Sequence, residues 1–208
     1  MKIKKLAVMA AMATVAFSAV QAQAQSAAFQ GFSVGLNAGV NAADTELTYG
    51  GAVIDGVGHT SAVGTLQGAY GWAMGPQSVV SVGATYNLND ADGAEFRNAG
   101  GLKVLDYKAR DVYSIYVEPG FLLSDKTLAF LSLSYEGATA KGEGSGYQVR
   151  KGIRGAGYGF GMRTALDKNL YFQVAVKHVV YDSERFPNDP TDFKAKSTLG
   201  SVGVGYKF

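Results

Sequence analysis

The feature that most constrains this chain is a two-residue alternation, in which large apolar side chains occupy one phase and small or polar side chains the other. Successive side chains of a strand point to opposite faces, so this pattern predicts a sheet with one apolar face and one small, polar face. The last segment shows it most clearly, with Val202, Val204, Tyr206 and Phe208 in the apolar phase and Ser201, Gly203, Gly205 and Lys207 in the other.

Seven earlier segments repeat this pattern, and the links between them alternate in length. The segments cover residues 32–41, 62–74, 78–88, 113–121, 129–135, 155–166 and 170–180. Tight turns at 75–77, 124–126 and 167–169 alternate along the chain with long polar links at 42–61, 89–111, 138–154 and 182–196. This order is typical of an up-and-down membrane barrel, in which an even number of strands places both chain ends on the periplasmic side.

The alternative is a soluble sandwich or a lipocalin-like barrel, which would show the same alternation. A soluble barrel fills its interior with large apolar groups and carries charges outside. In this chain the second phase holds glycine, serine, threonine, amides and a few charges, which suits a narrow polar lumen with the apolar phase facing lipid. We therefore predict an all-β fold: an eight-stranded antiparallel up-and-down transmembrane β-barrel with short periplasmic turns and long extracellular loops.

The aromatic residues of the apolar phase sort by height along the strands. One group lies near the short turns and the other lies about eight residues further along, which corresponds to about 20 Å of height at roughly 3.3 Å per residue and a tilt near 40°. We expect two aromatic girdles, one at each membrane interface. The first comprises Phe32, Trp72, Phe121 and Phe172, and the second Tyr86, Tyr113, Tyr135 and Tyr158.

The N-terminus predicts a secretory signal peptide over residues 1–24, which leaves a barrel domain over residues 25–208. Lys2, Lys4 and Lys5 precede an apolar run, and small residues follow that allow cleavage after Ala22 or Ala24. Without this segment the chain carries 16 basic against 17 acidic side chains. This balance gives no reason to expect nucleic-acid binding. The absence of cysteine excludes a disulfide scaffold and a zinc–thiolate site.

The chain resembles the bacterial outer-membrane β-barrel superfamily of opacity-type and OmpX/OmpA-type proteins. The resemblance rests on the terminal Val202-Gly203-Val204-Gly205-Tyr206-Lys207-Phe208 and on Val117-Glu118-Pro119-Gly120-Phe121, which continues as Leu122-Leu123-Ser124-Asp125-Lys126-Thr127. It implies a monomer in the outer membrane, in contact with lipid and lipopolysaccharide. It also implies periplasmic chaperones during export and recognition of Val204, Tyr206 and Phe208 by the outer-membrane assembly machinery.

Charged residues of the small phase point into the predicted lumen, where they must be paired. We expect an ion pair between Glu118 and Arg163 at similar depth, with Lys177 and Tyr116 nearby. Such a network predicts a closed polar plug, and a narrow channel for small solutes is the alternative.

A lipid A-modifying enzyme is a further alternative, because His178 lies near the outer end of a late strand. The lipid A deacylase family needs a serine two positions after its histidine, whereas this chain has His178-Val179-Val180. The acidic run 89–95 does not fit the calcium-binding EF-hand register. We expect no catalytic residues, no metal and no cofactor.

The role that remains is structural or a surface interaction, such as adhesion or envelope integrity, carried by the extracellular loops. An extracellular ligand would meet these loops first.

Overall fold

The computed structural model describes residues 26–49, 52–97, 103–144, 147–185 and 192–208. The predicted signal peptide lies outside the described residues. Almost all of the described chain is β-structure, and eight long strands form the wall of one barrel. These are β1 (Gly31–Tyr49), β2 (Ala52–Ala73), β3 (Ser78–Asn87), β5 (Lys103–Ser124), β6 (Thr127–Gly144), β7 (Tyr147–Ala165), β8 (Leu170–Tyr181) and β10 (Asp192–Lys207).

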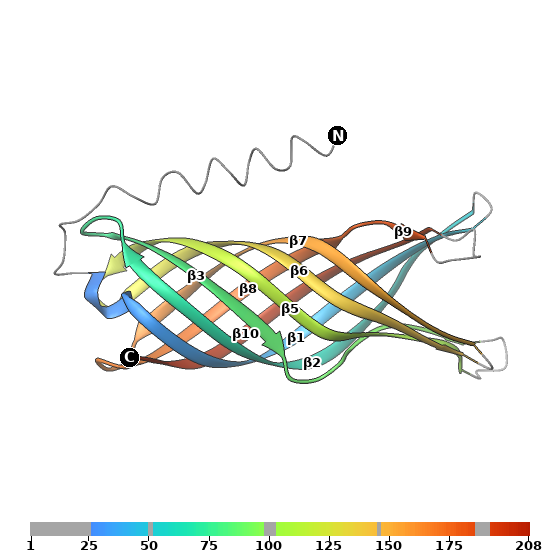
Figure 1. The fold of residues 1–208 in the computed structure, drawn as a ribbon, viewed down its shortest axis with the longest axis horizontal. Coiled ribbons are helices and arrows are strands. Elements are labelled where there is room, and N and C mark those ends of the chain that lie inside the picture. Colours follow the sequence, from blue (N-terminus) through green and yellow to red (C-terminus); the bar gives the residue numbers. More distant parts are fainter. Residues whose placement is uncertain (1–25, 50–51, 98–102, 145–146, 186–191) are drawn as a thin grey trace.

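Each wall strand pairs antiparallel with its neighbours in chain order, and β1 pairs with β10 to close the barrel (Figure 1). The closing seam is long, running from Ser33↔Lys207 to Thr48↔Asp192. Closure leaves the wall without a free edge inside the membrane, where unpaired backbone groups would be costly. The eight-stranded antiparallel barrel is therefore confirmed. No helix among the described residues is long and apolar enough to cross a membrane.

The strands are longer than the sequence pattern suggested, and much of the predicted loop sequence is paired strand. β1 and β2 stay paired up to Tyr49↔Ala52, and β6 and β7 up to Gly144↔Tyr147. Beyond the barrel wall the strands continue outward as two groups of paired strands (Figure 1). One group contains β1, β2, β9 (Glu184–Arg185) and β10, and the other contains β4 (Ala91–Arg97), β5, β6 and β7. We call these two groups the outer extensions.

The face that carries the apolar side chains changes from the outer to the inner one where the strands leave the barrel wall. Within the wall, outward residues such as Phe160 and Leu131 are 62% and 61% exposed, and most inward residues of its middle part are polar or small. In the outer extensions β7 shows the reverse: Ile153 points inward and is buried with Ala138 and Ala140, whereas Arg154 points outward and is exposed. Lipid favours an apolar outer surface and water a charged one, so this reversal marks the outer boundary of the membrane.

The opposite end of the barrel is closed by the residues that precede β1. A short 3₁₀-helix, η2 (Ser26–Phe29), lies at the periplasmic end of the barrel (Figure 1). Phe29 packs there against inward-facing Val79, Leu122 and Leu128, and each of the four is at most 6% exposed. We call this cluster the periplasmic plug.

Candidate functional site

The centre of the lumen holds an ion pair between Arg163 of β7 and Glu118 of β5. Arg163 Nη2 donates to Glu118 Oε2 at 3.1 Å, and both side chains are almost fully buried. The guanidinium carbon also lies 5.2 Å from the ring centroid of Phe130 and 5.0 Å from that of Tyr171. Arg163 is thus held by one carboxylate and two aromatic rings, which together compensate its removal from water.

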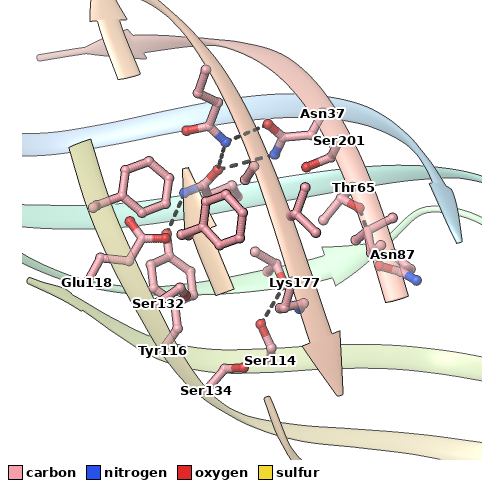
Figure 2. A pocket seen from close by; sticks show the side chains of 18 residues that line it. Asn37, Thr65, Asn87, Ser114, Tyr116, Glu118, Ser132, Ser134, Lys177 and Ser201 are labelled. Atoms are coloured by element: carbon pink, nitrogen blue, oxygen red, sulfur yellow. Dashed lines mark hydrogen bonds between the residues drawn. The ribbon is translucent and has the colours of Figure 1, made fainter. Parts of the chain in front are cut away.

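Three amide side chains extend this pair across the bore. Arg163 Nε donates to Gln173 Oε1 at 3.1 Å, and Gln173 Nε2 in turn donates to Asn37 Oδ1 at 2.6 Å and to Gln67 Oε1 at 2.7 Å. Gln67 Nε2 donates to the hydroxyl of Tyr116 at 2.5 Å. Figure 2 shows Asn37 and Tyr116 on opposite sides of this network. The six residues come from five strands, so the bonds tie together parts of the wall that are not neighbours.

Lys177 lies further toward the outside, where it forms an ion pair with a residue that the sequence analysis did not select. Its Nζ donates to Glu136 Oε1 at 2.8 Å, and Ser134 Oγ donates to the same oxygen at 2.6 Å. Glu136 is only 1% exposed. It was missed because the predicted strand ended one residue earlier, at Tyr135, whereas β6 continues to Gly144. The alternation itself places Glu136 inward, in phase with Ser132 and Ser134.

Small cavities remain between these layers. One of about 70 Å³ lies between the two charged pairs and is lined by polar groups such as Ser114, Ser132 and Thr65 (Figure 2). This is room for about two water molecules at roughly 30 Å³ each. A second cavity, of about 80 Å³, lies in the outer half among Ala140, Ile153 and Val179. Neither volume alone would hold a drug-sized ligand, for which pockets of about 300 Å³ or more are typical.

Inward-facing glycines make room for the large side chains of this network. A Cβ on Gly205 would overlap the ring of Tyr171, and a Cβ on Gly83 would overlap that of Tyr116. The sequence pattern predicts such glycines as the small lining of a narrow polar lumen. In the structure they instead face aromatic rings that fill the space.

The predicted girdle residues all lie on the outer surface, each at least 39% exposed. The C-terminus lies beside the start of β1: the backbone N–H of Phe208 donates to the carbonyl of Phe32 at 2.9 Å, and their ring centroids are 5.7 Å apart. Val204 and Tyr206 share this outer face. The roles of these residues in membrane anchoring and assembly stay predictions.

His178 also lies on the outer surface, at the outer end of β8. Its Nδ1 is 2.9 Å from Thr198 Oγ1, and its ring centroid is 5.4 Å from that of Tyr158. Across the described ranges, no group of three or more histidine, aspartate or glutamate side chains could hold a metal ion.

The comparison with protein families agrees with this architecture. The family model described as outer membrane protein beta-barrel domain matches residues 10–208. The chain belongs to this outer membrane β-barrel family. It is accordingly a protein of the outer membrane, and its apolar outer wall faces lipid. No curated protein sequence matches it.

Several solved outer-membrane barrels are similar to this family member in structure. Ail, the attachment invasion locus protein of Yersinia pestis, is 15% identical over 86% of this chain and 100% of its own, with a TM-score of 0.46. OprG from Pseudomonas aeruginosa is 12% identical over 86% and 97%, with a TM-score of 0.48. The protease OmpT from Escherichia coli is 8% identical over 85% and 96%, also with a TM-score of 0.48. Identities this low say nothing about a shared role.

Proposed function

We propose that this outer-membrane barrel is a closed scaffold that holds its two outer extensions at the cell surface for interaction with other molecules. The proposal rests on a contrast between the bore and the outer ends of the strands. The bore holds layers of inward side chains with small cavities, of about 70 and 80 Å³, between them, whereas the strands continue outside as paired β-structure.

Three layers block the bore, two of them apolar and one polar. The periplasmic plug excludes water at one mouth, the Arg163 network crosses the centre, and an apolar cluster follows outside it, formed by Ala138, Ala140, Ile153, Val179 and Tyr181. An ion on this path would have to pass two apolar layers and displace a buried ion pair. Both steps are costly, because a buried charge needs a partner to replace its water.

The outer extensions are built to keep one shape. Backbone pairing continues to the last described residues of the β1–β2 and β6–β7 hairpins, so the described part of each hairpin is already held by a backbone ladder before a partner binds. A preorganised surface loses less entropy on binding than a flexible loop does. This favours a surface-interaction role over a purely structural one.

A narrow channel is the second candidate, favoured by the polar cavity between the two charged pairs. An enzymatic role finds less support. The His178 imidazole contacts a threonine hydroxyl and a tyrosine ring, and no ion pair between this ring and a carboxylate occurs in the described chain.

Shortening one outer extension tests the proposal. Replacing residues 45–57 by Asn-Gly should close the β1–β2 hairpin next to the Asp44↔Gly58 pair and leave the barrel wall intact. We expect cells that carry this variant to lose adherence to matrix-coated surfaces while heat-modifiable migration of the barrel persists. The matched control is Gly200→Ala in the wall, where a Cβ meets nothing within 4 Å. Unchanged adherence after the equivalent shortening of both the β1–β2 and β6–β7 hairpins would contradict a surface-interaction role.

A further inference from the structure

We propose that the outer wall binds a phosphate group of an outer-leaflet lipid at a site formed by Tyr158, His178, Lys196 and Thr198. We call this the outer-rim site. It is separate from the filled bore and from the tips of the outer extensions, so it goes beyond the proposed surface role.

Strand register brings the four residues together on one face. Tyr158 of β7 lies opposite His178 of β8, and His178 lies opposite Thr198 of β10. Lys196 is two residues before Thr198 and therefore points to the same side of the sheet. That side is the outside of the barrel, because Tyr158 is 60% exposed and the intervening Ser197 bonds inward to Asn41. Diagonal neighbours such as His178 and Lys196 are about 7–8 Å apart, a gap that one phosphate can bridge.

The histidine is held in place before any ligand arrives. Thr198 Oγ1 lies 2.9 Å from Nδ1, and the Tyr158 ring packs against the imidazole with centroids 5.4 Å apart. The Nδ1 atom is therefore occupied, and Nε2 is the ring nitrogen left to meet a ligand. With the Thr198 hydroxyl donating to Nδ1, the proton lies on Nε2, which joins the Lys196 ammonium and the Tyr158 hydroxyl as a donor to the several acceptor oxygens of a phosphate.

The height of the site identifies the source of the phosphate as a lipid. On the same three strands, the outward residues toward the membrane centre are apolar, as at Phe160, Val176 and Val202. Further out the surface becomes charged, with Arg154 and Lys194 exposed. A polar cluster on a lipid-facing wall is costly unless it meets head groups, and this one lies at the boundary where head groups begin. The acyl chains of a bound lipid would then cover the apolar residues below.

The charge balance around the site favours an anion. Lys196, Lys194 and Arg154 point outward there, against Asp44 and Asp182. Asp44 lies opposite Lys196 in register but forms no ion pair with it among the described residues, so the Lys196 ammonium keeps donors for a ligand. Asp182 has contacts of its own. Among the outward side chains that the structure describes there, three cations therefore stand against two acids.

Lipid titration of the refolded protein in phosphatidylcholine vesicles tests the site. Adding bisphosphorylated lipid A should raise the thermal midpoint of the heat-modifiable gel shift, and dephosphorylated lipid A should not. The variants Lys196→Gln and His178→Ala should each need about tenfold more lipid A for half of that rise, as expected for loss of one charge-assisted hydrogen bond. Lys168→Ala, a lysine exposed on a periplasmic turn, is the matched control and should behave as wild type.

Each other outcome would overturn the proposal. Equal responses of the wild type and both variants would mean that lipid A acts elsewhere on the barrel. A rise with dephosphorylated lipid A would show that the sugar or acyl chains, and not the phosphate, are recognised. An equal rise with inorganic phosphate in plain phosphatidylcholine vesicles would show a free-anion site in place of a lipid site. Lys196→Gln changes an outward side chain at the membrane boundary, so a failure to assemble would itself contradict its assigned role.

Discussion

The guanidinium of Arg163 reaches across the bore to the carboxylate of Glu118, although β7 and β5 are separated by β6. The 3.1 Å contact therefore joins non-neighbouring parts of the wall, in addition to neutralising two buried charges. Loss of either side chain would remove this contact across the bore and leave the other charge buried without its partner.

Removing one partner of this pair should cost more than replacing both. We expect Glu118→Ala to lower the free energy of unfolding by about 3–5 kcal/mol, because it leaves the Arg163 charge buried without its carboxylate. The double variant Glu118→Gln with Arg163→Met should be less destabilised, since no uncompensated charge remains. Urea titrations of the heat-modifiable band measure both values. A double variant that is less stable than Glu118→Ala would argue against the ion pair as the main interaction of Glu118.

The periplasmic plug should stabilise the barrel, although other layers of side chains also block the bore. Phe29→Ala removes a large ring from contact with Val79, Leu122 and Leu128, and similar core truncations cost about 3–5 kcal/mol. Phe172→Ala is a matched control, because this ring lies on the outer surface. Thermal gel-shift midpoints in detergent should fall more for Phe29→Ala. Equal shifts would indicate that η2 contributes little to closure of the mouth.

The glycine opposite Tyr171 should tolerate no side chain. Gly205→Ala would drive a methyl group into the Tyr171 ring, whereas Gly200→Ala on the same strand meets nothing within 4 Å. We expect a lower folded yield for Gly205→Ala in vesicle refolding, and recovery when Tyr171→Ala is added. If Gly205→Ala and Gly200→Ala refold equally well, Tyr171 does not pack against this glycine.

Several of these positions could be predicted from the sequence, and others could not. Glu118 and Arg163 were selected because alternation places both inward at similar depth. The amides Asn37, Gln67 and Gln173 were not selected, since an uncharged side chain gives no sign of its partner across a bore.

The outer extensions were predicted as loops for a different reason. The outer phase is apolar within the wall, but beyond Tyr158 it becomes charged while the inner phase becomes apolar, as at Arg154 and Ile153. The two-residue period continues, but the apolar side chains now point inward and the charged side chains outward. A test for alternation of either sign would have extended β7 and β6 and included Glu136.

The terminal residue should matter for assembly more than for export. Phe208 adds a backbone hydrogen bond and a ring contact to Phe32 at the closing seam, and the last strand is the expected signal to the assembly machinery. Deletion of Phe208 should reduce the amount of protein in the outer membrane while signal cleavage stays normal, and Phe208→Tyr should restore most of it. Cell fractionation with immunoblotting measures this, and normal outer-membrane yield of the truncated chain would count against the assigned signal.

Planar-bilayer conductance of the refolded protein measures whether the bore is closed. We predict no discrete current steps above the lipid baseline for the wild type, and also none for Glu118→Ala, because the periplasmic plug and the outer apolar cluster remain in both. Stable unitary currents in the wild type, or currents that arise in Glu118→Ala, would contradict the account and favour a narrow channel.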